Sequence, residues 1–314
     1  MLNHTFMAST FKRKKMKTLF TFLTSIIFLI SAQAQTLNPY ILGASSSKSV
    51  AELTPEVSKA LADHQLKVVG SYVPASDNNR MVLVVTHPSL EKAVSQIGSL
   101  TGFAATLRVG ITREGDVTNV TYTNPVYWGN AYFRDDFSKV KSDYDAVAAS
   151  FTAAMKSLDG YKGTPFGSKK GIDADDLHDY HYMMAMPYFD DTETIGEFGS
   201  YAEAVAKIDA NLKKGVPNAK LVYKVEIPGK ELALYGIALS GENGESKFLP
   251  KIDISSPKHT AFLPYEILVM GKEVHILHGR YRIALSFPDL TMGTFTKIMS
   301  TPGDIEEMME KVVE

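Results

Sequence analysis

The sequence contains no cysteine. This absence excludes disulfide bonds, thiolate metal sites, a cysteine nucleophile and a lipid-modified N-terminal cysteine. Several common motifs are also missing, because the chain has no Gly-x-Ser-x-Gly elbow, no phosphate-binding loop and no dinucleotide-binding fingerprint. The fold must therefore be stabilised by its core, and no short motif announces a reaction.

The chain also lacks an excess of positive charge. Its 314 residues include 33 Lys and Arg against 35 Asp and Glu. Five of the basic residues and none of the acidic ones fall within residues 1–34, so the remainder has 28 basic and 35 acidic residues, a net charge of −7. Proteins that bind nucleic acids usually carry a clear positive patch or stripe. We therefore expect no nucleic-acid partner.

The one long apolar run lies near the N-terminus, at Leu19–Ile30. A block of basic residues precedes it, namely Lys12, Arg13, Lys14, Lys15 and Lys17. The segment Ser31-Ala32-Gln33-Ala34 follows it. A positive segment, an apolar core and an Ala-x-Ala exit are the three parts of a secretory signal peptide. The pattern predicts cleavage after Ala34 and an exported protein, either periplasmic or extracellular.

A short membrane anchor is the alternative, but the run is shorter than the ~18–20 residues that cross a bilayer. The start of the leader stays open, because Met16 begins a signal peptide of ordinary length as well as Met1 does. No second long apolar run is present, so the mature chain is expected to have no stable membrane insertion.

Two stretches of the sequence, 102–125 and 261–288, share a pattern. Each opens with an apolar segment led by an aromatic residue, continues as a strand, turns at a Gly-containing tip and ends near a proline. Such self-similarity predicts two related domains. We expect an α+β fold in which each domain is a small, mainly antiparallel sheet with helices on one face. The predicted domains are 48–159 and 198–314, joined by a connector at 160–197.

Local patterns place the expected elements. Stretches rich in β-branched residues predict strands at 66–73, 81–86, 105–112, 117–123, 220–227, 231–239, 266–270, 273–277 and 281–287. Apolar residues at spacings of three and four predict helices at 90–100 and 137–158, and capping patterns predict helices beginning near Thr54-Pro55, Ser200 and Thr301-Pro302. The strand at 281–287 has no counterpart in the first copy, so the duplication appears imperfect in the sequence.

These segments resemble a bacterial family called domain of unknown function 302. The resemblance rests on VVGSYVP followed by MVLVVTHPSL, on FAATLRVGIT, and on VTYTNPVYW, where Tyr122, Asn124 and Pro125 correspond to a Tyr-Asn-(Asp)-Pro ending with one extra residue. In the second copy the matching segment is FLPYEILV. This copy departs from the family pattern where Glu266 replaces the basic residue that corresponds to Arg108, and where SFPDL replaces the Asn/Asp-Pro ending.

The resemblance covers about residues 48–135 and 198–300. It implies a small α+β domain that pairs with itself, and it brings no established catalytic residues. The tandem copies would supply within one chain the pair that single-domain relatives form as a homodimer. A homodimer of the whole chain is the other possibility for its partners.

Aromatic residues gather after the first predicted hairpin. Tyr127, Trp128 and Tyr132 fall within eleven residues of Tyr122. Large aromatic rings either line apolar ligand pockets or fill cores and interfaces. We name the three as candidate ligand-binding residues and keep a packed interface as the alternative.

The densest polar tract lies at 173–191. His178 and His181 are three residues apart, which would place them on one side of a helical turn, and Met183 and Met184 follow. Imidazole and thioether ligands together suit copper, especially Cu(I). The tract is therefore a candidate metal site, although methionines also fill irregular cores.

The sequence favours a non-catalytic binding or interaction protein whose ligand, a small molecule or a protein, is not indicated. Copper handling through the His/Met tract is one alternative. An enzyme whose site is assembled from distant residues is another, because such a site leaves no short motif. No cofactor is indicated by any pattern.

Overall fold

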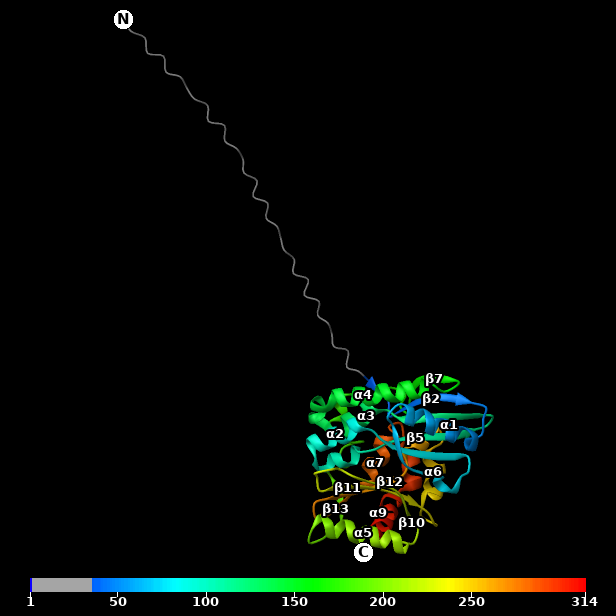
Figure 1. Ribbon diagram of the computed structural model, residues 1–314, viewed down its shortest axis with the longest axis vertical. Coiled ribbons are helices and arrows are strands. Elements are labelled where there is room, and N and C mark those ends of the chain that lie inside the picture. Colours follow the sequence, from blue (N-terminus) through cyan, green and yellow to red (C-terminus); the bar gives the residue numbers. More distant parts are fainter. Residues whose placement is uncertain (2–35) are drawn as a thin grey trace. The chain divides into compact units, whose positions relative to one another are not determined.

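The structure, a computed structural model, describes Met1 and residues 36–314 (Figure 1). The predicted signal peptide at 1–34 lies outside the described residues apart from Met1. The described residues 36–314 belong to one compact unit. The fold is α+β, as predicted, with open antiparallel sheets and helices packed on them.

The first sheet has six antiparallel strands in the order β3-β4-β5-β6-β2-β7. In chain order the strands are β2 (Tyr40–Ser46), β3 (Lys67–Tyr72), β4 (Arg80–Thr86), β5 (Leu107–Glu114), β6 (Val117–Thr123) and β7 (Tyr161–Phe166). Its helices are α1 (Val50–Asp63), α2 (Pro88–Ile97), α3 (Pro125–Phe133) and α4 (Phe137–Lys156). Helix α1 packs on β3, β4 and β5, and α4 packs on β2 and β7.

Local sequence explains these elements. Helix α1 begins with a capping box in which the Ser49 hydroxyl accepts from the Glu52 backbone N–H and the Glu52 carboxylate accepts from that of Ser49. The β5–β6 hairpin turns at Gly115, whose φ of +62° favours glycine. The apolar face of α4, which includes Val140, Val147 and Phe151, is buried as its spacing predicts.

The second sheet has five antiparallel strands in the order β10-β11-β12-β13-β9. The strands are β9 (Thr192–Glu197), β10 (Ala219–Glu226), β11 (Leu232–Leu239), β12 (Tyr265–Met270) and β13 (Glu273–Leu277). Its helices are α5 (Tyr201–Lys214), α6 (Glu245–Ile252), α7 (Gly279–Ser286), α8 (Met292–Phe295) and α9 (Thr301–Val313). In Figure 1 the labels of α5 and α9 lie at the opposite end of the unit from α4. A short pair, β1 (Thr36–Leu37) and β8 (Ile172–Asp173), forms a separate two-stranded sheet.

The two sheets follow the same order of elements. The series β2-α1-β3-β4-α2-β5-β6-α3 in the first matches β9-α5-β10-β11-α6-β12-β13-α7 in the second. When β2 to β6 are equated with β9 to β13 in this way, the spatial orders β3-β4-β5-β6-β2 and β10-β11-β12-β13-β9 coincide. Strand β7 is the one addition to the first sheet.

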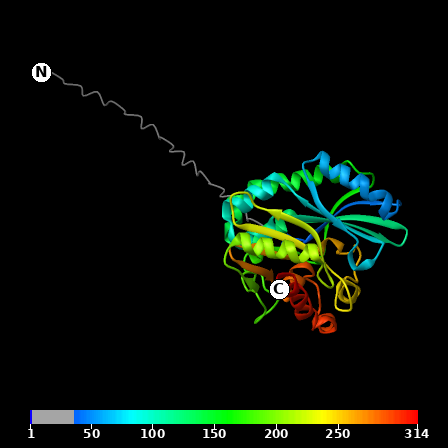
Figure 2. The same ribbon diagram turned by 60° about the horizontal axis from the view of Figure 1, so that its bottom comes forward.

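Contacts between the two sheets are reciprocal. A 3-10 turn before β5, η2 (Ser99–Ala104), packs on β11 and β12, and the equivalent turn before β12, η5 (Thr260–Phe262), packs on β4, β5 and β6. The two edge strands β3 and β10 lie side by side (Figure 2). A side chain added at Gly102 would meet Leu268, and one added at Gly110 would meet Thr260. Here Gly102 and Thr260 hold equivalent positions, as do Gly110 and Leu268.

Helices α3 and α7 show the same exchange. Tyr127 and Tyr281 are the third residues of the two helices, and Ala131 and Leu285 are the seventh. The Tyr127 hydroxyl donates to the Leu285 carbonyl at 2.8 Å, and the Tyr281 hydroxyl donates to the Ala131 carbonyl at 3.5 Å. In a two-fold arrangement, a contact made by one half is repeated between the equivalent residues of the other half. These two hydrogen bonds are such a repeated contact.

The predicted strand at 281–287 is wrong, because these residues belong to helix α7. Seven of the eight residues of α7 are buried. A helix buried on nearly every side has no polar face, so its sequence carries no 3.6-residue period that would distinguish it from a strand. Helix α7 is also the counterpart of α3, which the sequence analysis did not predict as a helix.

The segment 160–197 does more than connect. Its first part forms β7 beside β2, and its last part forms β9 beside β13. The sheets thus extend beyond the predicted domain boundaries at 48–159 and 198–314, since β2 precedes residue 48. The buried residues of both sheets form a single hydrophobic cluster. Two separate domains are therefore not confirmed.

Crossing a bilayer requires a long apolar helix, and none of the helices in the described part of the chain meets that requirement.

Candidate functional site

The three candidate aromatic residues lie in the core. Tyr127, Trp128 and Tyr132 are at most 3% exposed. The Trp128 indole N–H donates to the Pro39 carbonyl at 2.9 Å, and its ring lies edge-on to those of Tyr127 and Tyr132. These are contacts of a packed interface between α3 and its neighbours. A ligand role for the three residues stays a prediction.

The His/Met tract is an irregular loop after a short 3-10 turn, η4 (Asp175–Leu177), so His178 and His181 do not share a helix face. The His178 ring contacts Asn130 through Nε2 at 3.0 Å and Asp135 through Nδ1 at 3.4 Å. His181 contacts the Asp179 carbonyl and lies against Tyr188.

Of the three methionines in the tract, the two named as candidate ligands face solvent. Met184 is 90% exposed and Met183 is 41% exposed. Among the described residues, no group of three or more His, Asp or Glu side chains is arranged to hold a metal ion. The copper site therefore stays a prediction, and nothing in the geometry adds to it.

A cleft with a volume of about 520 Å³ lies elsewhere in the described part of the chain. Three segments that are distant in sequence form it: 165–169 after β7, 252–259 after α6, and 287–294 after α7. We call it the His259 cleft. Its volume falls in the range of about 300–1,000 Å³ that is usual for small-molecule sites.

The walls of the His259 cleft are apolar and its rim is polar. Phe166, Phe287, Ile252, Ile254 and Leu290 supply the apolar walls. The polar lining consists of Ser168, Lys169, Ser255, Ser256, Asp289, Thr291 and Thr294. The Asp289 carboxylate already accepts from the Lys169 backbone N–H at 2.8 Å and the Ser168 hydroxyl at 3.4 Å, so it braces the rim.

His259 is the one buried titratable side chain that lines this cleft. Its ring packs against Tyr40, Phe166 and Phe287, with centroids 4.7–5.5 Å apart. Its Nε2 atom is buried and has no hydrogen-bond partner among the described residues. A Cβ added at Gly167, whose φ is +104°, would lie 3.2 Å from Nε2, so a glycine there keeps a side chain away from this nitrogen.

Asp253 orients His259. Its Oδ1 accepts from the His259 backbone N–H at 2.8 Å and lies 3.3 Å from Nδ1. Burial alone would raise the pKa of Asp253, but the hydrogen bond from His259 and the charge of Arg80 outweigh burial and hold this pKa below its ordinary value. The ionised Asp253 therefore favours the tautomer with a proton on Nδ1, which leaves Nε2 as an acceptor toward the cleft.

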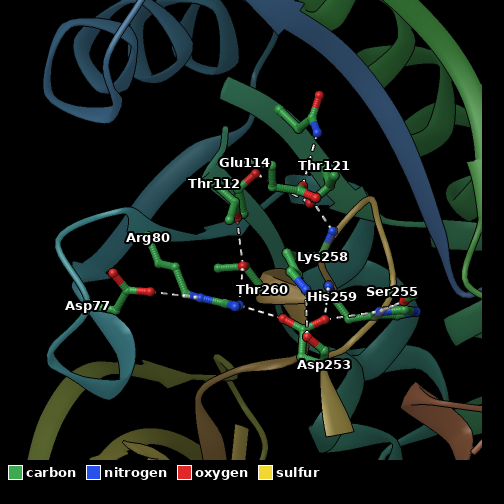
Figure 3. Close-up of polar contacts among 12 residues, drawn as sticks. Asp77, Arg80, Thr112, Glu114, Thr121, Asp253, Ser255, Lys258, His259 and Thr260 are labelled. Atoms are coloured by element: carbon green, nitrogen blue, oxygen red, sulfur yellow. Dashed lines mark hydrogen bonds and ion pairs between the residues drawn. The ribbon is translucent and has the colours of Figure 1, made fainter. Parts of the chain in front are cut away.

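Arg80 fixes Asp253 from the other side (Figure 3). Its Nη1 donates to Asp253 Oδ2 at 2.5 Å and to the Thr260 hydroxyl at 2.9 Å, and the Thr112 hydroxyl also donates to Thr260. Because Arg80 and Thr112 belong to β4 and β5, the first sheet holds in place a loop of the second.

The rest of this loop is held as well. The Lys258 backbone N–H donates to Glu114 and its ammonium group donates to the Asp253 carbonyl. Each contact fixes the backbone on one side of His259 or the other, so the imidazole is pre-oriented by the scaffold.

Ser255 does not complete a hydrolytic triad. Its hydroxyl lies 3.3 Å from His259 Nδ1, the same nitrogen that faces Asp253. A nucleophilic serine must contact the ring nitrogen opposite to the one that the acid orients. The arrangement therefore offers an oriented imidazole that can exchange a hydrogen bond or a proton with a bound molecule, without an activated nucleophile.

Sequence reasoning missed the His259 cleft. His259 stands alone, Asp253 and Arg80 are not adjacent to it in any known motif spacing, and the walls come from three distant segments. One indirect indication was present in the sequence, namely that it contains no short catalytic or ligand-binding motif.

The structure thus defines an α+β protein built from two antiparallel sheets of like topology, with a cleft on one side of their junction. No model of a known protein family matches the chain, and no curated protein sequence matches it. The resemblance to the domain of unknown function 302 family accordingly stays a prediction.

Proposed function

We propose that this chain is an exported, non-catalytic binding protein that holds a small amphipathic molecule in the His259 cleft. The single observation that carries the proposal is the buried, unpartnered Nε2 of His259 at an apolar cleft of about 520 Å³. Binding sites commonly combine apolar walls with a few precisely placed polar groups. Leaving a buried polar atom without a partner is costly, and a ligand that supplies the partner recovers that cost.

The ligand class follows from the lining. Phe166 and Phe287 favour a flat or branched apolar body of modest size. A hydroxyl or N–H group on that body would donate to His259 Nε2, and the serine and threonine hydroxyls of the rim would bind further polar groups. The export part of the proposal rests on the leader pattern at 1–34 alone.

We further propose that the two sheets are an intrachain pseudo-dimer that arose by duplication. The matching order of elements and the reciprocal Tyr127–Leu285 and Tyr281–Ala131 bonds support it. In this arrangement the chain supplies both halves of the pair, so a binding site at their junction needs no second molecule.

The test uses as probe the amphipathic fluorophore 1-anilinonaphthalene-8-sulfonate, which joins an aromatic body to one anionic sulfonate group. Ile254 lines the cleft and its side chain is largely exposed, so Ile254→Asp changes the cleft without disturbing the core. Val117, an exposed branched residue at the β5–β6 turn, gives the matched control Val117→Asp. We expect the probe to bind the native chain with an apparent affinity that falls at least tenfold in Ile254→Asp and is unchanged in Val117→Asp.

A second variant, His259→Gln, separates the polar contact from the apolar walls. It should keep probe binding while weakening molecules with a hydroxyl, such as 2-phenylethanol, relative to ethylbenzene. Equal probe binding by Ile254→Asp and Val117→Asp, or no binding by the native chain, would reject the cleft as the binding site. The mass of the protein recovered from outside the cytoplasm tests export independently, with a chain beginning at Gln35 expected.

A further inference from the structure

Three ionic side chains meet in the interior, at the junction of the two sheets and apart from the His259 cleft. Arg108 on β5, Glu266 on β12 and Arg282 on α7 are each at most 4% exposed. Glu266 pairs with Arg108 through Oε1 and lies 3.6 Å from Arg282 Nη2 through Oε2. These three side chains together carry two positive charges and one negative charge.

The two positive charges of the cluster influence each other. Burial lowers the pKa of Arg108, and the nearby charge of Arg282 lowers it further. Arg282 lies over the faces of Trp128 and Phe262 at 5.1 and 5.3 Å, where the negative faces of the two rings attract its charge. Neither ring carries a full negative charge, so these three side chains alone sum to +1, and the buried Glu245 carboxylate also acts electrostatically on Tyr265.

The cluster also has more donors than acceptors. Arg282 donates to the Ser286 hydroxyl and to the Phe262 carbonyl, both at 2.7 Å, but its Nε has no partner among the described residues. The Nε of Arg108 is likewise without a partner there. Glu266 Oε1 is already shared with the Tyr223 hydroxyl at 3.0 Å, so it has little capacity to accept more.

A tyrosine hydroxyl adds to this excess of donors. That of Tyr265 is buried and has no partner in the described part of the chain, whereas the Tyr40 hydroxyl contacts the Ser286 hydroxyl. Burial raises the pKa of both tyrosines and the charge of Arg282 opposes that rise, which places both rings within its electrostatic reach. Native interiors rarely leave several buried donors unsatisfied at one place.

A small cavity lies among these groups. Its volume is about 10 Å³, and its lining consists of Phe103, Tyr265, Glu266, Leu277 and Arg282. A space of this size accommodates about one water-sized species. All five lining residues are buried, so an occupant would be largely removed from solvent.

We propose that this cavity is a binding site for a single monatomic anion, chloride, held by Arg282 and the Tyr265 hydroxyl at the junction of the two sheets. A halide accepts hydrogen bonds without donating any, so it fits a site that is rich in donors. It also cancels the charge that Glu266 leaves uncompensated. A water molecule fits the same space but leaves the charge, and a molecular anion such as sulfate is too large for it.

Bromide distinguishes an anion from water directly. Crystals of the protein grown in sodium bromide should show an anomalous scattering peak in the cavity beside Arg282 and Tyr265. Density that refines as water without anomalous signal would overturn the proposal. This experiment needs no variant and does not depend on the ligand of the His259 cleft.

Thermal unfolding gives a second, independent reading. Since chloride would bind the folded chain alone, the midpoint temperature should rise with chloride concentration and saturate, at constant ionic strength maintained with sodium gluconate. Tyr265→Phe removes a hydroxyl that has no partner without the anion. It should leave the midpoint in gluconate unchanged or slightly higher, and should raise the half-saturating chloride concentration at least tenfold.

Tyr235→Phe is the matched control, because the Tyr235 hydroxyl bonds to Asp209 and does not line the cavity. Its chloride dependence should equal that of the native chain. Identical midpoints in chloride and gluconate, or equal chloride dependence in Tyr265→Phe and the native chain, would also overturn the proposal.

Discussion

The two sheets share a strand order but bring different side chains to the positions where they meet. Arg108 and Glu266 are the second residues of β5 and β12, and they form a buried ion pair with each other. Trp128 and Arg282 are the fourth residues of α3 and α7, and the guanidinium lies over the indole. Equivalent residues thus face their own counterparts across the junction.

This comparison shows what joining two copies in one chain permits. In a homodimer, residues that meet their own counterparts are identical, so Arg108 would face a second arginine. In one chain the two positions can differ, and a repulsive pair becomes an ion pair. Arg80, the first residue of β4, has a leucine as its counterpart, Leu232 at the start of β11. Arg80 anchors Asp253 and with it the loop of His259, and the counterpart position, Leu232, has no charged side chain that could do the same.

Giving position 266 the same charge as Arg108 should have the largest effect on stability. Glu266→Arg would place three guanidinium groups in the buried cluster, and we expect it to abolish cooperative unfolding, because breaking a buried ion pair alone costs about 3–5 kcal/mol. Urea unfolding followed by circular dichroism measures it. The double variant Arg108→Glu/Glu266→Arg should recover part of the loss.

A matched control is charge reversal in an exposed pair. Lys59 and Asp63 on α1 are both more than half exposed, so Asp63→Arg should cost about 1 kcal/mol or less. If Glu266→Arg lowered the free energy of unfolding no more than Asp63→Arg does, the Arg108–Glu266 pair would not be what holds the two sheets together.

The next effect contrasts two carboxylates that share Arg80. Asp253 is fully buried, whereas the Asp77 side chain is 41% exposed. Asp253→Asn should lower the free energy of unfolding by about 3–5 kcal/mol, because it leaves the buried guanidinium with only the partly exposed Asp77 as counter-charge. Asp77→Asn should cost about 1 kcal/mol or less. Equal losses in denaturant titrations would show that Asp253 does not anchor the loop of His259.

Lowering the pH should reproduce part of the stability loss expected for Asp253→Asn. Because the pKa of Asp253 is lowered in the folded chain, its contribution to stability is complete above the unfolded value of about 4 and is lost as the pH falls through the folded value. The Asp253→Asn variant should lack this acid-dependent loss.

Glu245 should make the stability of the fold decrease as the pH rises, the opposite of the effect of Asp253. It clamps the first sheet to α6 by accepting from the Tyr72 hydroxyl and the Ala75 backbone N–H, and it also accepts from the Leu239 backbone N–H. Burial raises its pKa to about 7. Since the folded chain holds this proton more tightly, the contribution is complete below about pH 4.5 and is lost as the pH rises toward 7, by about 3 kcal/mol in total.

Unfolding free energies measured between pH 4.5 and 8 check this slope. Glu245→Gln should flatten the part of the curve that Glu245 causes. Glu242, an exposed acid just before α6, supplies the control Glu242→Gln, which should keep the native slope. A native curve that rises steadily from pH 5 to 8 would contradict the prediction.

The smallest effect tests the two-fold relation itself. Tyr127→Phe should cost about 1 kcal/mol, because it leaves the Leu285 carbonyl without its donor. Tyr281→Phe should cost less, since its bond to the Ala131 carbonyl is 3.5 Å long against 2.8 Å. A larger loss for Tyr281→Phe would show that the two hydroxyls are not equivalent in role.

The sequence predicted those parts of the fold whose pattern is local. The β5–β6 and β12–β13 hairpins were found because Gly115 and Gly271 occupy turns with positive φ. Helix α4 was found because one of its faces is exposed. Helices α3 and α7 were not found, since they are buried on almost every side and their sequences keep no periodic polar face.

The candidate site could not be predicted in the same way. Tyr127, Trp128 and Tyr132 were noticed because aromatic residues are conspicuous, yet the fold buries them at the junction. His259 was not singled out, because its partners Asp253 and Arg80 and its apolar neighbours come from separate segments. Only the three-dimensional arrangement brings them together.

One feature of the topology bears on how the chain acquires its structure. In both sheets the first strand lies beside the last of the matching five, β2 beside β6 and β9 beside β13. The first strand of each sheet can therefore pair with β6 or β13 only after that later strand has been synthesised. Pairings between residues that are distant in the sequence form slowly. A chain emerging from the ribosome cannot close either sheet early. Such late closure leaves both sheets open at one edge until their last strands have been synthesised.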